Sequence, residues 1–181
     1  MARKKDAANS KKGNGGTPAA QPEGAPVPPP GDQPHIGIMG QYLKDLSFEN
    51  PNAPQSLAVQ SGQPEINISV NVNANQMGET DYEVSLELEA RAQHEGKVLF
   101  NVEMTYCGLF RLSNIPQDAL GAVVLVECPR IIFPFARRVL ADATRDGGFP
   151  PLMLDPIDFA AMFAQRVAQE QEAAKQGGGE A

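Results

Sequence analysis

Apolar and polar side chains alternate with a period of two between residues 64 and 111. The alternation forms three runs, at residues 66–74, 82–92 and 98–106, in which every second side chain is apolar and most of the others are Asn, Ser, Thr or Glu. This spacing is typical of strands that bury one face and wet the other. Since only His94-Glu-Gly separates the last two runs, we expect them to form an antiparallel hairpin.

A fourth strand is predicted at about residues 38–48, with Leu46 and Phe48 turned inward and Asp45 and Glu49 facing water. The sequence Asn50-Pro-Asn-Ala-Pro follows it. Proline cannot donate a hydrogen bond to a neighbouring strand, so the strand should stop there.

The period changes after residue 113. Asn114-Ile-Pro predicts a short apolar helix to about Val126, and Cys128-Pro-Arg should break it. A second helix is expected over about residues 132–146, with Pro134 in its first turn.

A last helix is expected to open with Asp155 as its N-cap. Strands precede helices along the chain, so the fold class is α+β, a four-stranded antiparallel sheet with helices packed on one face. Such a sheet buries a thin core and leaves two edge strands, which favours oligomerisation through a helix face or a sheet edge.

The composition changes along the 181 residues. Residues 1–34 contain seven Pro and five Gly with little to bury, which indicates a disordered N-terminal arm. Residues 35–175 should hold the folded domain, and 176–181 a disordered polar tail.

Charge favours a basic partner. The chain carries a net charge of −7, and residues 41–103 hold ten acidic side chains against three basic ones. This excess of acid argues against nucleic-acid binding, which needs clustered Lys and Arg. A negative face attracts a positive partner, although a merely solvated face would show the same composition.

The termini and apolar runs predict a cytoplasmic protein. The start, Met1-Ala-Arg-Lys-Lys-Asp, leads into no apolar signal segment. No uninterrupted apolar stretch reaches the ~18 residues of a membrane span, so we expect no membrane insertion.

Catalytic and metal chemistry find little support. His35 and His94 lie at a domain boundary and in a turn, where neither suits a general base. Cys107 and Cys128 lack the spacing and flanking His of a zinc site, and structural thiols are the better interpretation. We therefore predict no enzyme activity, no cofactor and no metal.

Apolar side chains are concentrated near residues 131–135 and 149–154. Core packing explains such runs in most proteins, and a groove for extended peptides is the alternative.

Four separated segments resemble the SecB family of bacterial protein-export chaperones. They are Tyr42-Leu-Lys-Asp-Leu-Ser-Phe-Glu-Asn-Pro-Asn-Ala-Pro54, Tyr82-Glu-Val, Cys128-Pro-Arg-Ile-Ile-Phe-Pro-Phe-Ala-Arg137 and Gly148-Phe-Pro-Pro-Leu-Met-Leu-Asp-Pro-Ile-Asp-Phe159. The resemblance runs in order from about Gln41 to Val167.

The resemblance implies a cytosolic, ATP-independent holdase. Its members bind unfolded precursor proteins and pass them to the translocation ATPase SecA, and they assemble as a homotetramer, a dimer of dimers. Any zinc would belong to SecA.

The resemblance also implies two sites. The SecA-binding positions would be Asp45, Glu49, Asn101 and Glu103. Asn101 stands where relatives place Leu, and the three acids retain the electrostatic part of the contact. The candidate client-binding groove comprises Leu57, Ile131, Ile132, Phe133 and Phe135.

Two alternatives remain open at this stage. One is a SecB-like chaperone dedicated to a toxin–antitoxin client. The other is a small α+β enzyme or ligand binder with its pocket between sheet and helices, which would require a buried acid or base on the inward face.

Overall fold

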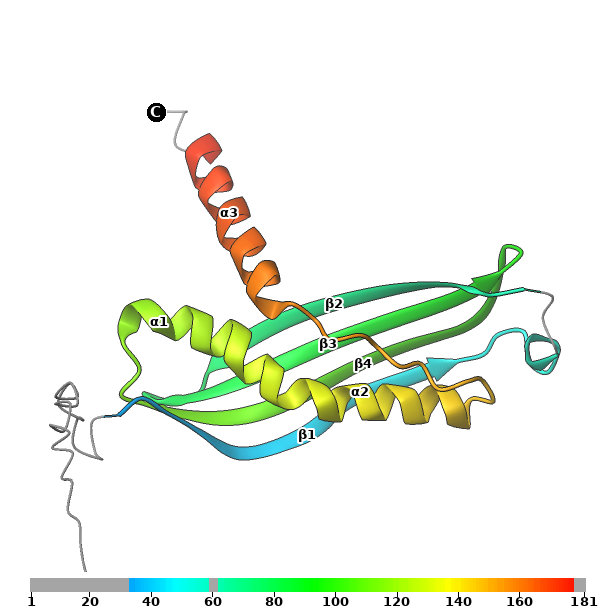
Figure 1. Cartoon of the computed structure of the whole chain (residues 1–181), viewed down its shortest axis with the longest axis horizontal. Coiled ribbons are helices and arrows are strands. Elements are labelled where there is room, and N and C mark those ends of the chain that lie inside the picture. The colour runs from blue at the N-terminus through cyan, green and yellow to red at the C-terminus, as the bar shows by residue number, and fades with distance from the viewer. Residues whose placement is uncertain (1–32, 59–61, 178–181) are drawn as a thin grey trace, which may run out of the picture.

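A computed structural model describes residues 33–58 and 62–177 of the chain. The four predicted strands are present and form one antiparallel sheet in the order β1-β4-β3-β2 (Figure 1). Their bounds are His35–Glu49 for β1, Glu65–Gln76 for β2, Asp81–His94 for β3 and Lys97–Ser113 for β4. A short 3₁₀ turn, η1 (Gln55–Leu57), follows β1. The expected N-terminal arm lies almost entirely outside the described residues.

β1 and β2, the two edge strands, differ in regularity. β2 pairs with β3 in continuous register from Glu65 to Gln76. β1 pairs with β4 through two register shifts, at Ile38/Gly40 and Leu43/Asp45. An extra residue inverts the alternation of faces, and Lys44 at the second shift restores Leu46 and Phe48 to the inward face opposite Met104 and Val102.

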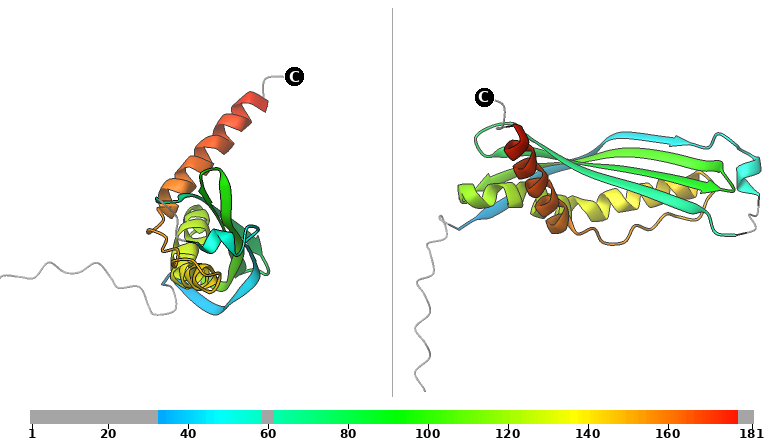
Figure 2. Two further views of the ribbon diagram at one scale, coloured as in Figure 1. Left: turned by 90° about the vertical axis from the view of Figure 1, so that its right-hand side faces the viewer. Right: turned by 90° about the horizontal axis from the view of Figure 1, so that it is seen from above.

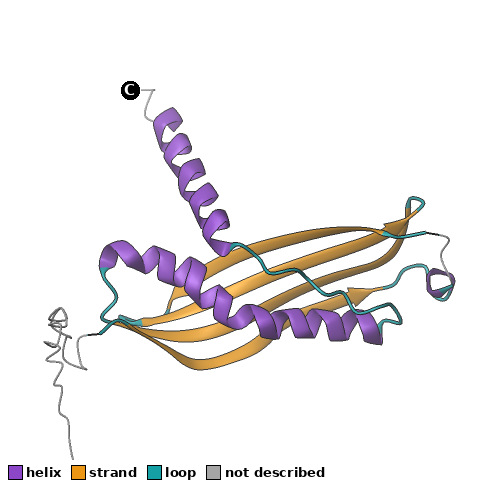
Figure 3. Ribbon diagram, in the orientation of Figure 1, coloured by secondary structure: helices purple, strands orange, loops and turns teal. Residues whose placement is uncertain are grey.

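The helices cover one face of the sheet only, as the two rotated views show (Figure 2). α1 (Gln117–Ala122), the π-helical segment η2 (Val123–Glu127) and α2 (Cys128–Asp146) follow one another without a break (Figure 3). The prediction that Cys128-Pro-Arg breaks the helix is therefore wrong, and α2 begins at Cys128 rather than near Ile132. The wider π turn lies just before Pro129, so the residue without a main-chain N–H falls where the helix changes from π to α geometry.

Pro134 lies inside α2 and not in its first turn, which corrects a second expectation. The side chain of Pro134 is exposed, so the carbonyl that loses its intrahelical donor is on the side of the helix that faces water. The opposite side packs on the sheet through the fully buried Ile132, Ala136 and Leu140. Helix and sheet approach closely at Gly108, where a Cβ atom would lie 2.9 Å from Ile132 Cγ2.

α3 begins at Phe159 and ends at Gly177. The predicted N-cap Asp155 is wrong, because Asp158 Oδ1 accepts a hydrogen bond of 3.0 Å from the Ala161 N–H. That contact, from the residue before the helix to its third residue, is the geometry of an N-cap. The helix also extends two residues into the predicted tail of 176–181.

The continuous helix Gln117–Asp146 is, by length and composition, long and apolar enough to span a membrane. In the fold it packs against the sheet through Val124, Val126 and Ile132, which are at most 6% exposed. A packed core helix passes the same test of length and composition.

Candidate functional site

The sheet face away from the helices carries a cluster of carboxylates. The strand register places Asp45 and Glu87 on either side of Thr105, and Glu89 directly opposite Glu103. These four acids line one shallow hollow of about 370 Å³. We call Asp45, Glu87, Glu89 and Glu103 the acidic patch. The sequence predicted Asp45 and Glu103, but it singled out neither Glu87 nor Glu89, because their proximity depends on the register between strands.

The charges of the acidic patch are not neutralised within the described part of the chain, where none of the four acids forms an ion pair. Their hydrogen-bond partners are neutral amides: Asn71 and Asn73 donate to Glu87 at 3.0 and 2.9 Å, and Asn101 donates to Glu103 at 3.3 Å. Like charges directly opposite each other on neighbouring strands repel. The pair Glu89 and Glu103 is therefore stabilised by any cation that lies over it.

Glu49 and Asn101 are paired in register one row further along β1 and β4, with Arg91 on the other side of Asn101. The carbonyl oxygen of the Asn101 side chain is buried and accepts no hydrogen bond among the described residues. The structure thus brings the four predicted SecA-binding residues onto one face, with Asp45 and Glu103 in the hollow and Glu49 and Asn101 beside it.

Glu83 differs from the other acids on this face. It was expected in water with its neighbours, but it is only 9% exposed. Tyr42 donates its phenolic proton to the Glu83 carboxylate, and Lys44 Nζ lies 3.3 Å away. The hydrogen bond from Tyr42 and then the charge of Lys44 hold the pKa of Glu83 below its usual value despite partial desolvation. The same bond raises the pKa of Tyr42. Glu83 is thereby neutralised internally and fixes the bulge at Lys44.

The helix side of the molecule carries a groove whose lining combines apolar side chains with three arginines and one aspartate of α2. This groove of about 640 Å³ runs between α2 and the segment of residues 149–157, which we call the strap. Its lining includes Phe133 and Pro134 from α2 and Met153 and Pro156 from the strap. Thr144 anchors the strap, because its buried hydroxyl accepts a 2.9 Å hydrogen bond from the Leu152 N–H. The same hydroxyl lies within donor distance of the Leu140 and Ala141 carbonyls.

The five predicted client-binding residues do not form a single surface. Ile132 is fully buried, so its assignment to an accessible groove is wrong: it packs where α2 crosses Gly108. Phe133 is 7% exposed but lines the groove. Phe135 and Leu57 are 46% and 47% exposed, and Ile131 is half-buried. Leu57 lies at Gly148, beside the end of α2.

Two further apolar surfaces are exposed. On β2, Ile66 and Ile68 point to the helix side of the sheet but are 39% and 48% exposed. We call them the β2 strip. Along β1 a second set of large apolar side chains is open to solvent, the β1 patch, which consists of Ile38, Met39, Tyr42, Leu43 and Leu46. The sequence predicted that the thin core would leave apolar surface, but not its location.

Within residues 33–58 and 62–177 no group of three or more His, Cys, Asp or Glu residues is placed to hold a metal ion. Cys107 and Cys128 are both buried, as expected of structural thiols. Burial raises the pKa of both thiols, that of Cys128 to about 12. Thiols that stay protonated are poor nucleophiles and poor metal ligands.

The fold and its two surfaces define the chain as an α+β binding protein. The family described as preprotein translocase subunit SecB matches residues 30–170. A protein-export protein SecB of Afipia carboxidovorans is 55% identical over 143 residues, which cover 79% of this chain and 89% of that protein. The same protein of Rhodopseudomonas palustris is 53% identical and covers 81% and 93%.

The chain belongs to the SecB family of protein-export chaperones. A solved structure shares the fold: the SecB-like chaperone of Mycobacterium tuberculosis in complex with a ChAD peptide from the HigA1 antitoxin has a TM-score of 0.53. It is 17% identical to this chain, covering 67% of it and 90% of the solved chain.

Proposed function

We propose that the chain is a cytosolic, ATP-independent holdase that binds unfolded precursor proteins on its apolar surfaces and docks on SecA through the acidic patch. One observation carries the proposal: the two faces of a single sheet present different chemistries, one with exposed apolar side chains and the other with the acidic patch, whose four carboxylates form no ion pair among the described residues. Family membership supplies the export pathway.

The groove and the β2 strip suit clients of many sequences. Burying apolar area contributes about 25 cal/mol per Å² whatever the sequence that supplies it. A folded protein has already hidden its apolar side chains, so only an unfolded client can offer much area. Affinity should therefore follow the degree of unfolding of the client.

The free edge of β2 adds main-chain recognition. The carbonyl of Val72 points away from β3, since it accepts a hydrogen bond from Arg166 of α3. In a regular antiparallel pair, alternate residues direct their main-chain groups the same way. Ile66, Ile68 and Val70 thus offer outward N–H and C=O groups. An extended client segment can pair with them as an added strand.

β2 lacks the sequence features and the bulges that usually protect an edge strand. From Glu65 to Gln76 it holds no Lys, Arg or Pro, and its register with β3 shows no bulge. β1 has two register shifts and the charges of Lys44 and Asp45. Proteins use such features to prevent pairing with other chains, and their absence supports β2 as the client edge.

The acidic patch would receive a basic segment of SecA. Glu49 extends the negative surface, and the unpartnered carbonyl oxygen of Asn101 adds an acceptor beside Glu103. Exposed charge pairs are screened within about 8 Å at physiological ionic strength. This contact should weaken as salt is added, whereas client binding should not.

The β1 patch would be covered in a homotetramer, a dimer of dimers. Five large apolar side chains, each at least 38% exposed along one edge, exceed the scattered apolar exposure of an ordinary monomer surface. Sedimentation analysis of the full chain should give four times the monomer mass. A replacement of Leu43 by Glu should lower that mass, and a monomeric wild type would contradict the assignment.

The holdase function is tested by light scattering from a denatured export precursor diluted into buffer without nucleotide. The protein in several-fold excess should suppress aggregation, and added ATP should change nothing. Aggregation at the rate of the precursor alone would overturn the proposal.

A further inference from the structure

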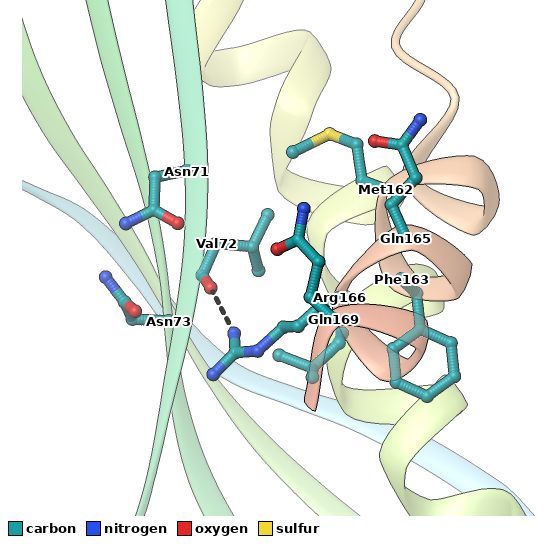
Figure 4. A pocket seen from close by; sticks show the side chains of 9 residues that line it. Asn71, Val72, Asn73, Met162, Phe163, Gln165, Arg166 and Gln169 are labelled. Atoms are coloured by element: carbon teal, nitrogen blue, oxygen red, sulfur yellow. Dashed lines mark hydrogen bonds between the residues drawn. The ribbon is translucent and has the colours of Figure 1, made fainter. Parts of the chain in front are cut away.

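α3 reaches the sheet edge through one hydrogen bond, while its first turns are packed on the core by Phe159, which is 1% exposed, and by Met162 and Phe163. Arg166 Nη1 donates a hydrogen bond of 3.3 Å to the carbonyl oxygen of Val72, drawn as the dashed line in Figure 4. Among residues 33–58 and 62–177 this is the single hydrogen bond between α3 and a strand. Its acceptor belongs to the outward row of β2 groups that an added strand would use.

A pocket of about 320 Å³ lies beside this contact, between α3 and β2 (Figure 4). Its apolar lining comes from three elements: Val72 of β2, Leu125 of η2, and Met162 and Phe163 of α3. Neutral amides from β2 and α3, together with Arg166, form the rest of the lining. The pocket can hold one apolar side chain, with polar groups at its rim to meet a main chain.

The attachment is exposed. The side chain of Arg166 is 50% exposed and also pairs with Glu170 at 3.1 Å within the same helix. Residues 168–175 of α3 are exposed, and the helix points away from the body of the molecule (Figures 1 and 2). Arg166 further lines a hollow on the outer face with Asp45 and Glu87. A guanidinium displaced from Val72 therefore has carboxylates in the same hollow.

We propose that Arg166 is a gate on the client edge. Its N–H occupies the acceptor that a backbone N–H of an added client strand would occupy, so a client can extend past Val70 only when α3 is released. Release also withdraws Met162 and Phe163 and opens the pocket to a client side chain. This proposal rests on the proposed holdase function, and in it α3 regulates how far a client strand can pair along β2.

The gate makes the observed affinity depend on the fraction of molecules with α3 released. When a protein binds only in one of two states, the apparent Kd equals the intrinsic Kd divided by the fraction in that state. Removing the Arg166 donor raises this fraction. Client binding should then strengthen by roughly three- to tenfold, which is the range that one partly exposed charged hydrogen bond can supply.

The test compares Arg166→Ala with Lys175→Ala, a matched loss of one exposed cation near the end of the same helix. The probe is a permanently unfolded, carboxymethylated polypeptide with a fluorophore, and its Kd is measured by anisotropy on the full chain. Arg166→Ala should lower the Kd three- to tenfold, Lys175→Ala should leave it unchanged, and Arg166→Lys, which keeps a donor, should stay within twofold of wild type.

Amide hydrogen exchange separates the gate from a general loosening of the helix. The probe should protect the outward amides of Val72 and Ala74 from exchange more strongly in Arg166→Ala than in wild type. An unchanged or higher Kd for Arg166→Ala would overturn the gate while wild type still binds the probe. Failure of wild type to bind the probe would instead overturn the holdase function.

Discussion

The two faces of the sheet are built from the same strands but leave different groups unsatisfied. On the outer face the charges remain, because Asp45, Glu89 and Glu103 form no ion pair among the described residues. On the helix side apolar area remains, because a single long helix is narrower than four strands and leaves Ile66 and Ile68 open. One alternating pattern therefore yields two binding chemistries that can be changed independently.

The largest effect is expected from reversing charge in the acidic patch. Asp45→Lys combined with Glu103→Lys should weaken binding of a basic SecA-derived peptide by roughly 30-fold or more, since two close attractions become repulsions. Client affinity should stay within twofold. Calorimetry with each ligand measures both.

The matched control for this pair is Glu79→Lys combined with Glu95→Lys, which makes the same change of net charge at exposed turn residues. It should leave peptide binding nearly intact. Equal loss in the two double variants would show that net charge, and not the patch, sets the affinity.

Substitutions at two neighbouring residues of β2 should show which face of the sheet binds the client. Ile68→Asp places a charge in the β2 strip and should weaken binding of an unfolded client by about tenfold, because the buried apolar area is lost and a carboxylate is desolvated. Asn67→Asp, one position along on the outer face, should leave client affinity unchanged. Anisotropy with the labelled unfolded polypeptide distinguishes them, and equal effects at both positions would exclude a face-specific site.

A smaller effect is expected at the strap. Thr144→Val keeps the shape of the side chain but leaves the Leu152 N–H without its acceptor. The free energy of unfolding should fall by about 1–2 kcal/mol, and exchange at the Leu152 amide should accelerate. Urea denaturation gives the first quantity, and unchanged exchange at Leu152 would contradict the role of Thr144 as the anchor.

The smallest effect concerns pH. The folded pKa of Glu83 lies below its ordinary value of 4.5, so the unfolded chain binds the proton more tightly. The stability that Glu83 contributes is complete above that value and is lost as pH falls through the folded pKa. Glu83→Gln should cost about 1 kcal/mol at pH 7 and should flatten this acid dependence. Denaturation curves from pH 7 to 3 would show the same slope in both proteins if the Tyr42 bond were unimportant.

How far the sequence predicts the fold depends on whether a feature is local. Period-two alternation predicts β2, β3 and β4 and, near the end of β1, the inward Leu46 and Phe48, because each strand shows the burial of one face in its own sequence. The continuity of the helix through Pro129 is missed, since the π turn before it is not visible in a pattern of apolar residues. Asp155 and Asp158 both precede a helical stretch, and only the geometry shows which one caps it.

The same distinction between local and non-local features applies to the sites. The family resemblance predicts Asp45 and Glu103, and the strand register brings these two acids close to Glu87 and Glu89 of β3. Ile132 belongs to an apolar run like Phe135, yet one is fully buried and the other is 46% exposed, because they face different sides of α2. An apolar run alone does not say which of its members remain accessible.

The independence of the two surfaces is tested most directly by measuring both ligands together. The Kd of the basic SecA-derived peptide is determined by calorimetry with the protein free and again with the protein saturated by the unfolded polypeptide. Both ligands should bind at once, with the two Kd values within about threefold of each other. Displacement of one ligand by the other would contradict a molecule that holds its client on one face and its ATPase on the opposite face.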